Sequence, residues 1–432
     1  MPVLNVGSSK VLAEGKTKII YNLPPEFPNL VRVVSKNDIT AGDGKKHDVI
    51  PNKGDLSTKT TVNVFRLLSA CGLPVAFVQD SRFKDVLLPN EFIAKSCEML
   101  PYEVVIRRLG LGSYLKRNPS VEKGSVFDTL VVEFYLKTSG KNFRGITLSV
   151  DDPIINSWNP EGVKISHPGE PYESAKNMLI PGHILFGKDQ DVLHPYKEME
   201  ELARLTFLIL EKAWEVQDLT LGDLKIEFGY DKEGRLLIAD VVDNDSWRLL
   251  DPSGQHLDKQ VYREGGELAK VALLYEEVAL RSERFRPLEK IPHIILWCPS
   301  EKDDPEVFER TPRCPKYLKD WDATVHYGSF HKEPERCLKE LRNSIMPSAG
   351  NTVIIAYVGR SNGAGPIIAA ATNTPVITVP SSFKDFPNDV WSSLRVPSEV
   401  PLMTVLEPQN AILAAINILG QRSPYAYALG RY

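Results

Sequence analysis

The feature that most limits the possible folds of this chain is a change in hydrophobic pattern near residue 290. Beyond it come three short, nearly continuous apolar runs, IPHIILW, TVIIAYVG and TPVITVP, with helix-like stretches between and after them. Strands that are apolar on both faces and alternate with helices are typical of a parallel sheet with crossover helices. We therefore predict an α/β parallel-sheet domain over residues 289–432, preceded by a mixed α+β domain over 1–262 and a helical linker over 263–288.

Within the first domain, two helices and one hairpin are predicted most clearly. The spacing of apolar residues predicts a helix over about 56–70 that stops at Gly72, and an amphipathic helix over 197–217. Two apolar strands, LKIEF and LLIADVV, flank the turn Asp231-Lys232-Glu233-Gly234 and predict a hairpin.

The overall composition excludes several classes of protein. The 52 basic and 56 acidic residues nearly balance, at a net charge of −4, so no nucleic-acid-binding surface is expected. No run of about 18 apolar residues exists, so no membrane span is expected. The five cysteines are widely spaced and form no C-x-x-C, which favours a reducing, cytoplasmic location over a disulfide framework or a zinc site.

The hairpin carries an unusual set of charged residues. A four-residue connection would place Lys225 opposite Asp240 and Glu227 opposite Ile238, and alternation would put all four on one face. A lysine and two carboxylates among apolar strands suit Mg²⁺ and phosphate, although a structural Lys–Asp pair is an equally good interpretation. In EGKTK, Lys16 and Lys18 share a strand face, which would suit a phosphate clamp or, more often, a solvated surface.

Two features of the second domain could carry chemistry. The glycine-rich stretch from Gly359 to Pro366 lies between a predicted strand and a predicted helix, where backbone N–H groups can bind an anion; a plain strand–helix turn is the alternative. His331 stands alone in a loop before a helix, and such a histidine is more often structural than catalytic.

The motifs of the first domain resemble the SAICAR synthetase family of de novo purine synthesis. They are EGKTK, SKNDITAGDG, NKG, SCEMLPYEVVIRRLGLGSYLKRNP, KIEFG and IADVVDNDSWRL, in that order. The resemblance implies an ATP- and Mg²⁺-dependent ligase that joins the carboxylate of CAIR, a carboxyaminoimidazole ribotide, to the amine of L-aspartate. It implies ATP binding by Lys16, Lys18, Glu98, Met99, Leu100 and Glu227, catalysis by Lys225 and Asp240, metal binding by Glu227 and Asp240, and ribotide binding by Asp43, Arg107, Ser113 and Arg248.

The second domain is similar to the AIR carboxylase family through GRSNGAGP, NTPVI and DVWSSLRVPS. That family carboxylates the aminoimidazole ribotide AIR with CO₂ and uses neither biotin nor ATP. The resemblance implies that His331 moves the proton and that the ribotide is held by Ser300, Asp303, Lys332, Arg360, Ser361, Asn362 and Gly363. Two departures stand out: CPSEKDD replaces the family's Gly-Ser-x-Ser-Asp loop, and Phe330 replaces an alanine beside the histidine.

With both domains in this order, the chain resembles the animal bifunctional PAICS family. This resemblance implies an enzyme that makes CAIR from AIR and then SAICAR, and that forms a homo-oligomer, an octamer, through the C-terminal domain. Two alternatives remain open from the sequence. One is a SAICAR synthetase whose degenerate carboxylase domain serves assembly; the other is a nonenzymatic scaffold that senses ribotide or ATP, which the charged hairpin disfavours.

Overall fold

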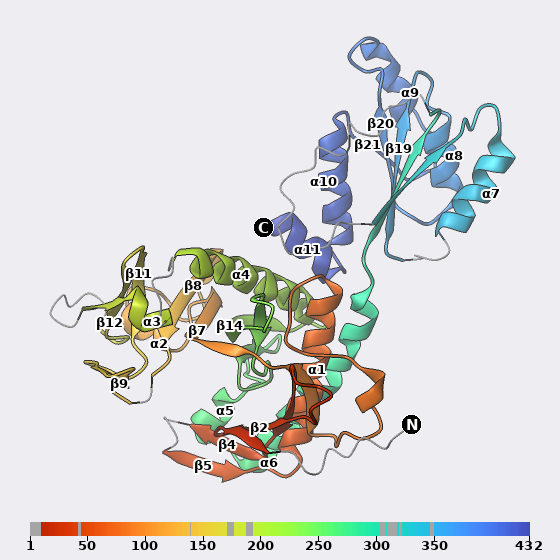
Figure 1. The fold of residues 1–432 in the computed structure, drawn as a ribbon. Helices are drawn as coiled ribbons and strands as arrows, with labels where there is room; N and C mark the ends of the chain where they lie inside the picture. The colour runs from red at the N-terminus through yellow and green to blue at the C-terminus, as the bar shows by residue number, and fades with distance from the viewer. Residues whose placement is uncertain are drawn as a thin grey trace. The chain divides into compact units, whose positions relative to one another are not determined.

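A computed structural model describes residues 10–41, 45–138, 140–170, 177–186, 193–301, 308, 318, 322–345 and 350–432. The chain divides into two compact units, with the boundary at Pro287–Leu288 (Figure 1). Within the described residues, no helix combines the length and the apolar character that crossing a bilayer requires.

The first unit is built on two main antiparallel sheets, as the α+β prediction requires. The smaller sheet has the order β1 (Val11–Glu14), β2 (Lys18–Asn22), β3 (Leu30–Ser35) and β6 (Glu91–Lys95). The larger has the order β13 (Met178–Pro181), β12 (Gly162–Ser166), β11 (Ile154–Asn159), β8 (Val126–Leu136), β7 (Glu98–Leu109), β14 (Thr220–Tyr230) and β15 (Leu236–Ala239), with β16 (Trp247–Leu250) also paired to β14. Two short hairpins complete the strands: β4 (Asp38–Ala41) with β5 (Lys46–Val49), and β9 (Asn142–Phe143) with β10 (Ile146–Thr147).

The helices of this unit are α1 (Lys53–Ala70), α2 (Ser113–Arg117), α3 (Gly182–Phe186), α4 (Leu193–Glu215), α5 (Gln260–Arg263) and α6 (Leu268–Ser282). The predictions of α1 and α4 are confirmed within a few residues. Helix α1 ends just before Gly72, whose φ of 99° is the left-handed conformation that favours glycine at a helix end. Helix α4 packs on the large sheet and buries its apolar stripe against β14, β7 and β8.

The predicted hairpin exists, but its predicted register is wrong by one residue. Glu227 lies opposite Ala239 and Tyr230 opposite Leu236, so the connection has five residues, Asp231–Arg235. The Asp231 carboxylate accepts hydrogen bonds from the backbone N–H groups of Glu233 and Arg235, which stabilises the longer turn. The predicted Lys225–Asp240 pair across the strands is therefore not formed.

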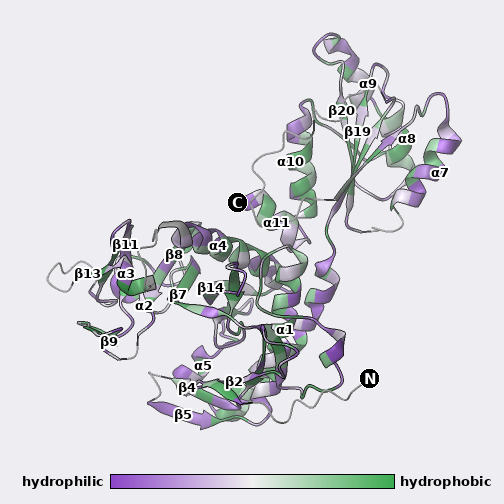
Figure 2. Ribbon diagram, viewed as in Figure 1, coloured by the Kyte–Doolittle hydropathy of each residue, from purple (hydrophilic) through white to green (hydrophobic). Residues whose placement is uncertain are grey.

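The second unit is the predicted parallel sheet. Its order is β18 (Asp322–Tyr327), β17 (His293–Cys298), β19 (Thr352–Val358), β20 (Val376–Pro380) and β21 (Leu402–Thr404). The helices are α7 (Pro334–Ile345), α8 (Ala364–Ala371), α9 (Trp391–Leu394), α10 (Pro408–Leu419) and α11 (Pro424–Arg431). Helices α7 and α8 cover one face of the sheet and α10 the other, so every residue of β17 is buried, as its apolar run predicts (Figures 1 and 2).

Helix α6, in the segment predicted as a linker, packs into the core of the first unit. Val271 and Tyr275 are buried in one cluster with Ile39 and Ile50. The Tyr275 hydroxyl donates to Asp245, which also pairs with Lys259 at 3.1 Å and with the fully buried Lys53 at 3.4 Å. The assignment of separate roles to residues 1–262, 263–288 and 289–432 stays a prediction.

Asp245 makes a testable contribution to stability. Burial alone would raise the pKa of its carboxyl, but Lys53, Lys259 and the Tyr275 hydroxyl hold that pKa at about 2. Asp245→Asn removes the carboxylate that pairs with both buried ammonium groups, so we expect a loss of about 2–3 kcal/mol at pH 7. The folded pKa is depressed, so this stabilisation is present above about pH 4 and is lost toward pH 2, where variant and wild type should converge.

Urea unfolding between pH 2 and pH 7 measures this difference. Asp251→Asn, in an exposed turn, is the control and should cost far less. An Asp245→Asn protein as stable as wild type at pH 7 would contradict the assignment.

Candidate functional site

A cavity of about 500 Å³ lies in the first unit, lined by strands of both sheets. One part is apolar, and another carries charged side chains. The lining residues are Leu12, Ala13, Lys18, Ile20, Val31, Val33, Phe65, Ala76, Phe92, Ala94, Lys95, Ser96, Cys97, Met99, Leu100, Pro101, Lys137, Glu227, Ala239 and Asp240. An apolar wall beside lysines and carboxylates suits a ligand with a flat apolar group and phosphates.

Five of the residues that the sequence assigned to ATP or metal line this cavity: Lys18, Met99, Leu100, Glu227 and Asp240. Lys16 and Glu98 are exposed and lie outside the lining. Lys225 stands beside the cavity through its contact with Glu227.

The charged side chains of the cavity form a chain of ion pairs. Glu227 bonds Lys137 at 2.7 Å and Lys225 at 3.1 Å, and Lys225 also bonds Glu103 at 3.0 Å. Asp240 contacts Lys18 instead of the predicted Lys225. Asp240 follows the end of β15 with a φ of 66°, a left-handed conformation in which the strand alternation used for the prediction no longer applies.

These ion pairs hold Glu227 in its charged form. Burial alone would raise the pKa of this carboxyl, but Lys225, Lys137 and Lys18 lower it to about 2. The pKa of Lys225 moves the opposite way: burial would lower it, and Glu227 and Glu103 raise it above its ordinary value. At neutral pH the cavity therefore presents an ionised carboxylate and a charged ammonium.

The donor set suits a hard divalent cation such as Mg²⁺, provided that a ligand supplies further oxygens. Within the described parts of the chain, no group of three or more His, Cys, Asp and Glu side chains could hold a metal ion alone. Glu227 and Asp240 offer two carboxylates in one cavity, and Mg²⁺ commonly uses one or two carboxylates together with substrate phosphates.

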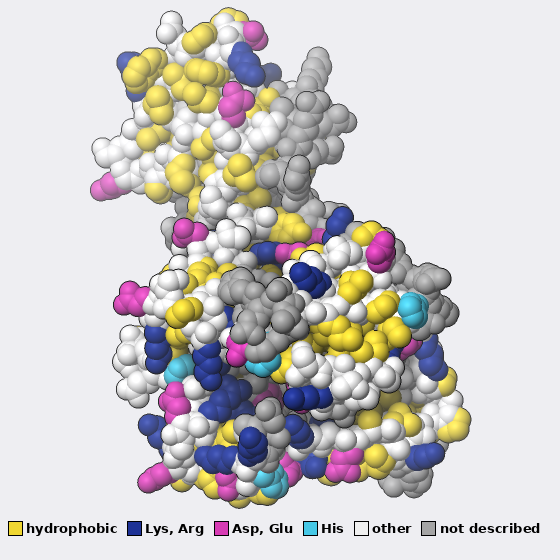
Figure 3. Space-filling view, turned by 90° about the vertical axis from the view of Figure 1, so that its left-hand side faces the viewer, with side chains coloured by type: hydrophobic (Ala, Val, Ile, Leu, Met, Phe, Trp, Pro, Cys, Tyr) yellow, Lys and Arg dark blue, Asp and Glu magenta, His cyan; other side chains and the backbone are white. Residues whose placement is uncertain are grey.

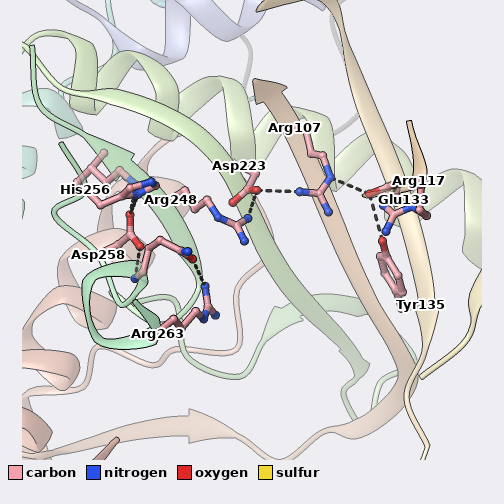
Figure 4. A network of polar contacts seen from close by, with 11 residues as sticks. Arg107, Arg117, Glu133, Tyr135, Asp223, Arg248, His256, Asp258 and Arg263 are labelled. Atoms are coloured by element: carbon pink, nitrogen blue, oxygen red, sulfur yellow. Dashed lines mark hydrogen bonds and ion pairs between the residues drawn. The ribbon is translucent and has the colours of Figure 1, made fainter. Parts of the chain in front are cut away.

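A second polar network in the same unit brings Arg107 and Arg248 together (Figure 4). Both pair with the buried carboxylate of Asp223, Arg107 at 2.8 Å. Arg107 also bonds Glu133 at 2.7 Å, and Glu133 is shared with Arg117. Three arginines against two carboxylates leave one positive charge, which suits an anionic ligand.

The remaining residues predicted to hold this ligand differ in their placement. Ser113 begins the short helix α2 and follows Gly112, on which the Arg248 guanidinium packs so closely that a Cβ there would lie 2.3 Å from one of its nitrogens. Asp43 lies outside the described residues.

In the second unit the structure brings His331 to the glycine-rich loop. His331 Nε2 is 2.9 Å from the carbonyl oxygen of Ser361, and the imidazole lies against Gly363. Asn362 is buried and organises the loop: its side chain accepts from the Gly365 N–H at 2.8 Å and donates to Ser393 at 3.1 Å.

Other predicted residues are less closely placed. Arg360 lies over the Phe386 ring at 4.5 Å, and Lys332 and Ser300 are exposed. Asp303 lies outside the described residues. The loop N–H groups of Ser361 and Asn362, expected to bind an anion, donate in this structure to Asp389 and Ser392.

Several residues of these sites were not predicted: Glu103, Lys137, Arg117, Glu133, Asp223, Asp389, Ser392 and Ser393. A signal existed for Asp223, because it lies two and four positions before Lys225 and Glu227 on the same strand. Lys137 and Glu133 lie on or just after β8, and their proximity depends on a strand order that the sequence does not state.

Comparison with known proteins finds family models and relatives that match most of the chain. A family model described as SAICAR synthetase matches residues 11–149 and 188–281, and one described as AIR carboxylase matches residues 303–428. Proteins of Homo sapiens and Drosophila melanogaster, each named bifunctional phosphoribosylaminoimidazole carboxylase/phosphoribosylaminoimidazole succinocarboxamide synthetase, are both 35% identical to it. The alignments cover 97% and 95% of this chain and 91% and 89% of those proteins. A phosphoribosylaminoimidazole-succinocarboxamide synthase of Roseiflexus sp. is 40% identical over 65% of this chain and 98% of its own length.

The position of His331 can be tested by filling the space against which it lies. Gly363 has a φ of −86°, which alanine adopts readily, but a Cβ there would lie 2.4 Å from His331 Nε2. Gly363→Ala should therefore keep the fold and displace the imidazole from Ser361, which the NMR signals of ¹⁵N-labelled histidine would report. Gly359→Ala is the matched control, because nothing lies within 4 Å of its added Cβ. Unchanged His331 signals in Gly363→Ala would contradict this geometry.

Proposed function

This chain belongs to the family of bifunctional AIR carboxylase/SAICAR synthetases, and from that membership we propose which of its residues carry each reaction. It acts in de novo purine synthesis, with an AIR carboxylase and a SAICAR synthetase activity. The observation that carries the proposal for the ligase is the cavity in which Lys18, Glu227 and Asp240 meet below an apolar wall.

In the ligase reaction, ATP lies in this cavity with its adenine against Met99 and Leu100. Lys18, Lys137 and Lys225 neutralise the phosphates, while Glu227 and Asp240 would hold Mg²⁺, which supplies further charge neutralisation when bound. The three lysines are already positioned by carboxylates, so they need little reorganisation when the phosphates arrive.

CAIR occupies the arginine network, with its phosphate toward Arg107, Arg248 and Ser113. A CAIR carboxylate oxygen attacks the γ-phosphorus and ADP leaves, which forms an acyl phosphate. The amine of aspartate then attacks the acyl carbon, phosphate leaves, and the amine loses a proton as the amide forms. A free carboxylate is a poor acyl donor, so the phosphorylation step is what makes the amide bond accessible.

In the carboxylase reaction, AIR lies at the loop around Ser361 in the second unit. CO₂ adds to a ring carbon, and His331 takes the proton that this carbon loses. The support is the position of His331 on the glycine-rich loop, 2.9 Å from the Ser361 carbonyl.

Paired substitutions test the two sites against one another in the full chain. Asp240→Asn should lower CAIR- and aspartate-dependent ADP formation by about 10²-fold or more, because a neutral amide is a poor Mg²⁺ ligand, and it should leave AIR carboxylation unchanged. His331→Asn should abolish AIR carboxylation and leave CAIR- and aspartate-dependent ADP formation unchanged. Wild-type ADP release by Asp240→Asn would remove the metal assignment, and a wild-type protein that uses CAIR but forms none from AIR would indicate a degenerate carboxylase.

We also propose that the second unit assembles the chain into a homo-oligomer, an octamer by the resemblance. Hydrophobic side chains gather on the surface of this unit (Figure 3), and among its exposed residues are Trp391 and Leu394, each 51% exposed, and Met403 at 40%. Burial of such side chains between copies would be favourable.

Light scattering on a doubly substituted chain tests this assembly. Leu394→Glu with Met403→Glu should lower the molar mass toward that of the monomer, because two charges would be buried in the interface. Val126→Glu, in the first unit and 68% exposed, is the control and should leave the mass unchanged. A mass unaffected by the double substitution would place the interface elsewhere.

A further inference from the structure

The segment Asp389–Ser393 is part of a sequence motif to which the proposed reactions give no role. It spans the end of a 3-10 helix (Pro387–Val390) and most of α9. Three of its side chains contact the glycine-rich loop on which His331 rests.

These contacts hold both peptide groups that flank Ser361. The Ser361 N–H donates to the Asp389 carboxylate, 3.2 Å from each oxygen. The following peptide group is held at its two ends: the Asn362 N–H donates to Ser392 Oγ at 3.1 Å, and the Ser361 carbonyl oxygen is 2.9 Å from His331 Nε2. The orientation of that carbonyl is therefore set by groups on the opposite side of the loop from His331.

The backbone of Ser361 shows why such support is needed. Its φ is 63°, in the left-handed region of backbone conformation that residues other than glycine, asparagine and aspartate seldom adopt. A residue keeps this conformation when its surroundings fix it, and such residues gather at functional sites. Asp389 fixes the peptide plane before Ser361, and Ser392 fixes the plane after it.

The carbonyl in turn determines which nitrogen of His331 carries the hydrogen. A carbonyl oxygen can only accept, so the neutral imidazole must donate from Nε2, which leaves the Nδ1 lone pair to receive a proton. Gly363 lies against the same nitrogen and leaves room for this arrangement, since a Cβ there would lie 2.4 Å from Nε2.

We propose that Asp389 is a positioning residue of the carboxylase site, which acts through Ser361 to fix the orientation and the tautomer of His331. It touches neither substrate nor the reacting atoms. The role of His331 as proton carrier rests on the proposed function, whereas the tautomer does not.

Kinetics of the full chain test the catalytic consequence. Asp389→Ala should lower kcat for AIR carboxylation about tenfold or more and change the KM for AIR less than about threefold, because the proton acceptor is misplaced while the binding groups remain. Asp389→Asn should restore most of kcat, because its amide oxygen still accepts from the Ser361 N–H. Asp385→Ala is the matched control, because Asp385 is an exposed acidic residue in the turn before the 3-10 helix that carries Asp389. All variants should keep wild-type SAICAR synthetase activity.

NMR of the ¹⁵N-labelled histidines tests the structural claim without any assay, with His331 assigned from the signal lost in His331→Gln. Wild type should show the Nε2–H form, and Asp389→Ala should lose that preference. A wild-type Nδ1–H form, a wild-type kcat in Asp389→Ala, or an Asp389→Asn variant as impaired as Asp389→Ala would each overturn the proposal. A wild-type chain that carboxylates no AIR would instead refute the proposed function, and the tautomer would still decide this inference.

Discussion

Strand β14 sets the central constraint on the first unit, because one face of this buried strand carries three charged side chains. Asp223, Lys225 and Glu227 follow one another at every second position of β14, which pairs with β7 on one side and with β15 and β16 on the other. Charges in such a setting are costly unless each has a counter-charge. The neighbouring strands supply them: Arg107 and Glu103 from β7, Arg248 from β16, and Lys137 just after β8.

The same requirement for neutralisation gathers cations at the two places where we propose that anions bind. Around Asp223 the cations outnumber the carboxylates, and near Glu227 two lysines, Lys18 and Lys137, line the cavity while Lys225 lies beside it. In the proposed assignment, one strand places the site for nucleotide phosphates next to the site for the ribotide. A ligase that transfers phosphate from ATP to CAIR needs the two sites side by side. In this proposal, the two-residue spacing of charged side chains along a single strand provides that adjacency.

Much of this arrangement could be read from the sequence, and the failures have local physical causes. The turn and the apolar strands predict the hairpin, but its register depends on hydrogen bonds that the Asp231 carboxylate accepts from the backbone of a turn one residue longer. The partner of Asp240 was missed because the chain leaves the strand conformation at that residue. Helix α6 lies in the segment predicted as a linker, and its contact with the first unit through Tyr275 and Asp245 joins residues far apart in the chain, which sequence spacing does not reveal. The loop N–H groups of the second unit were expected to face a ligand, and their internal acceptors lie about 30 residues away along the chain.

One isotope experiment tests most directly whether a single chain runs both reactions in sequence. The full-length protein would receive ¹³C-bicarbonate, AIR, ATP, Mg²⁺ and L-aspartate, and the product would be examined by ¹³C NMR. The carbon of CO₂ becomes the carboxylate of CAIR and then the acyl carbon that aspartate attacks. The account therefore predicts SAICAR labelled at its amide carbonyl. Unlabelled SAICAR from added CAIR, with no labelled product from AIR, would contradict it.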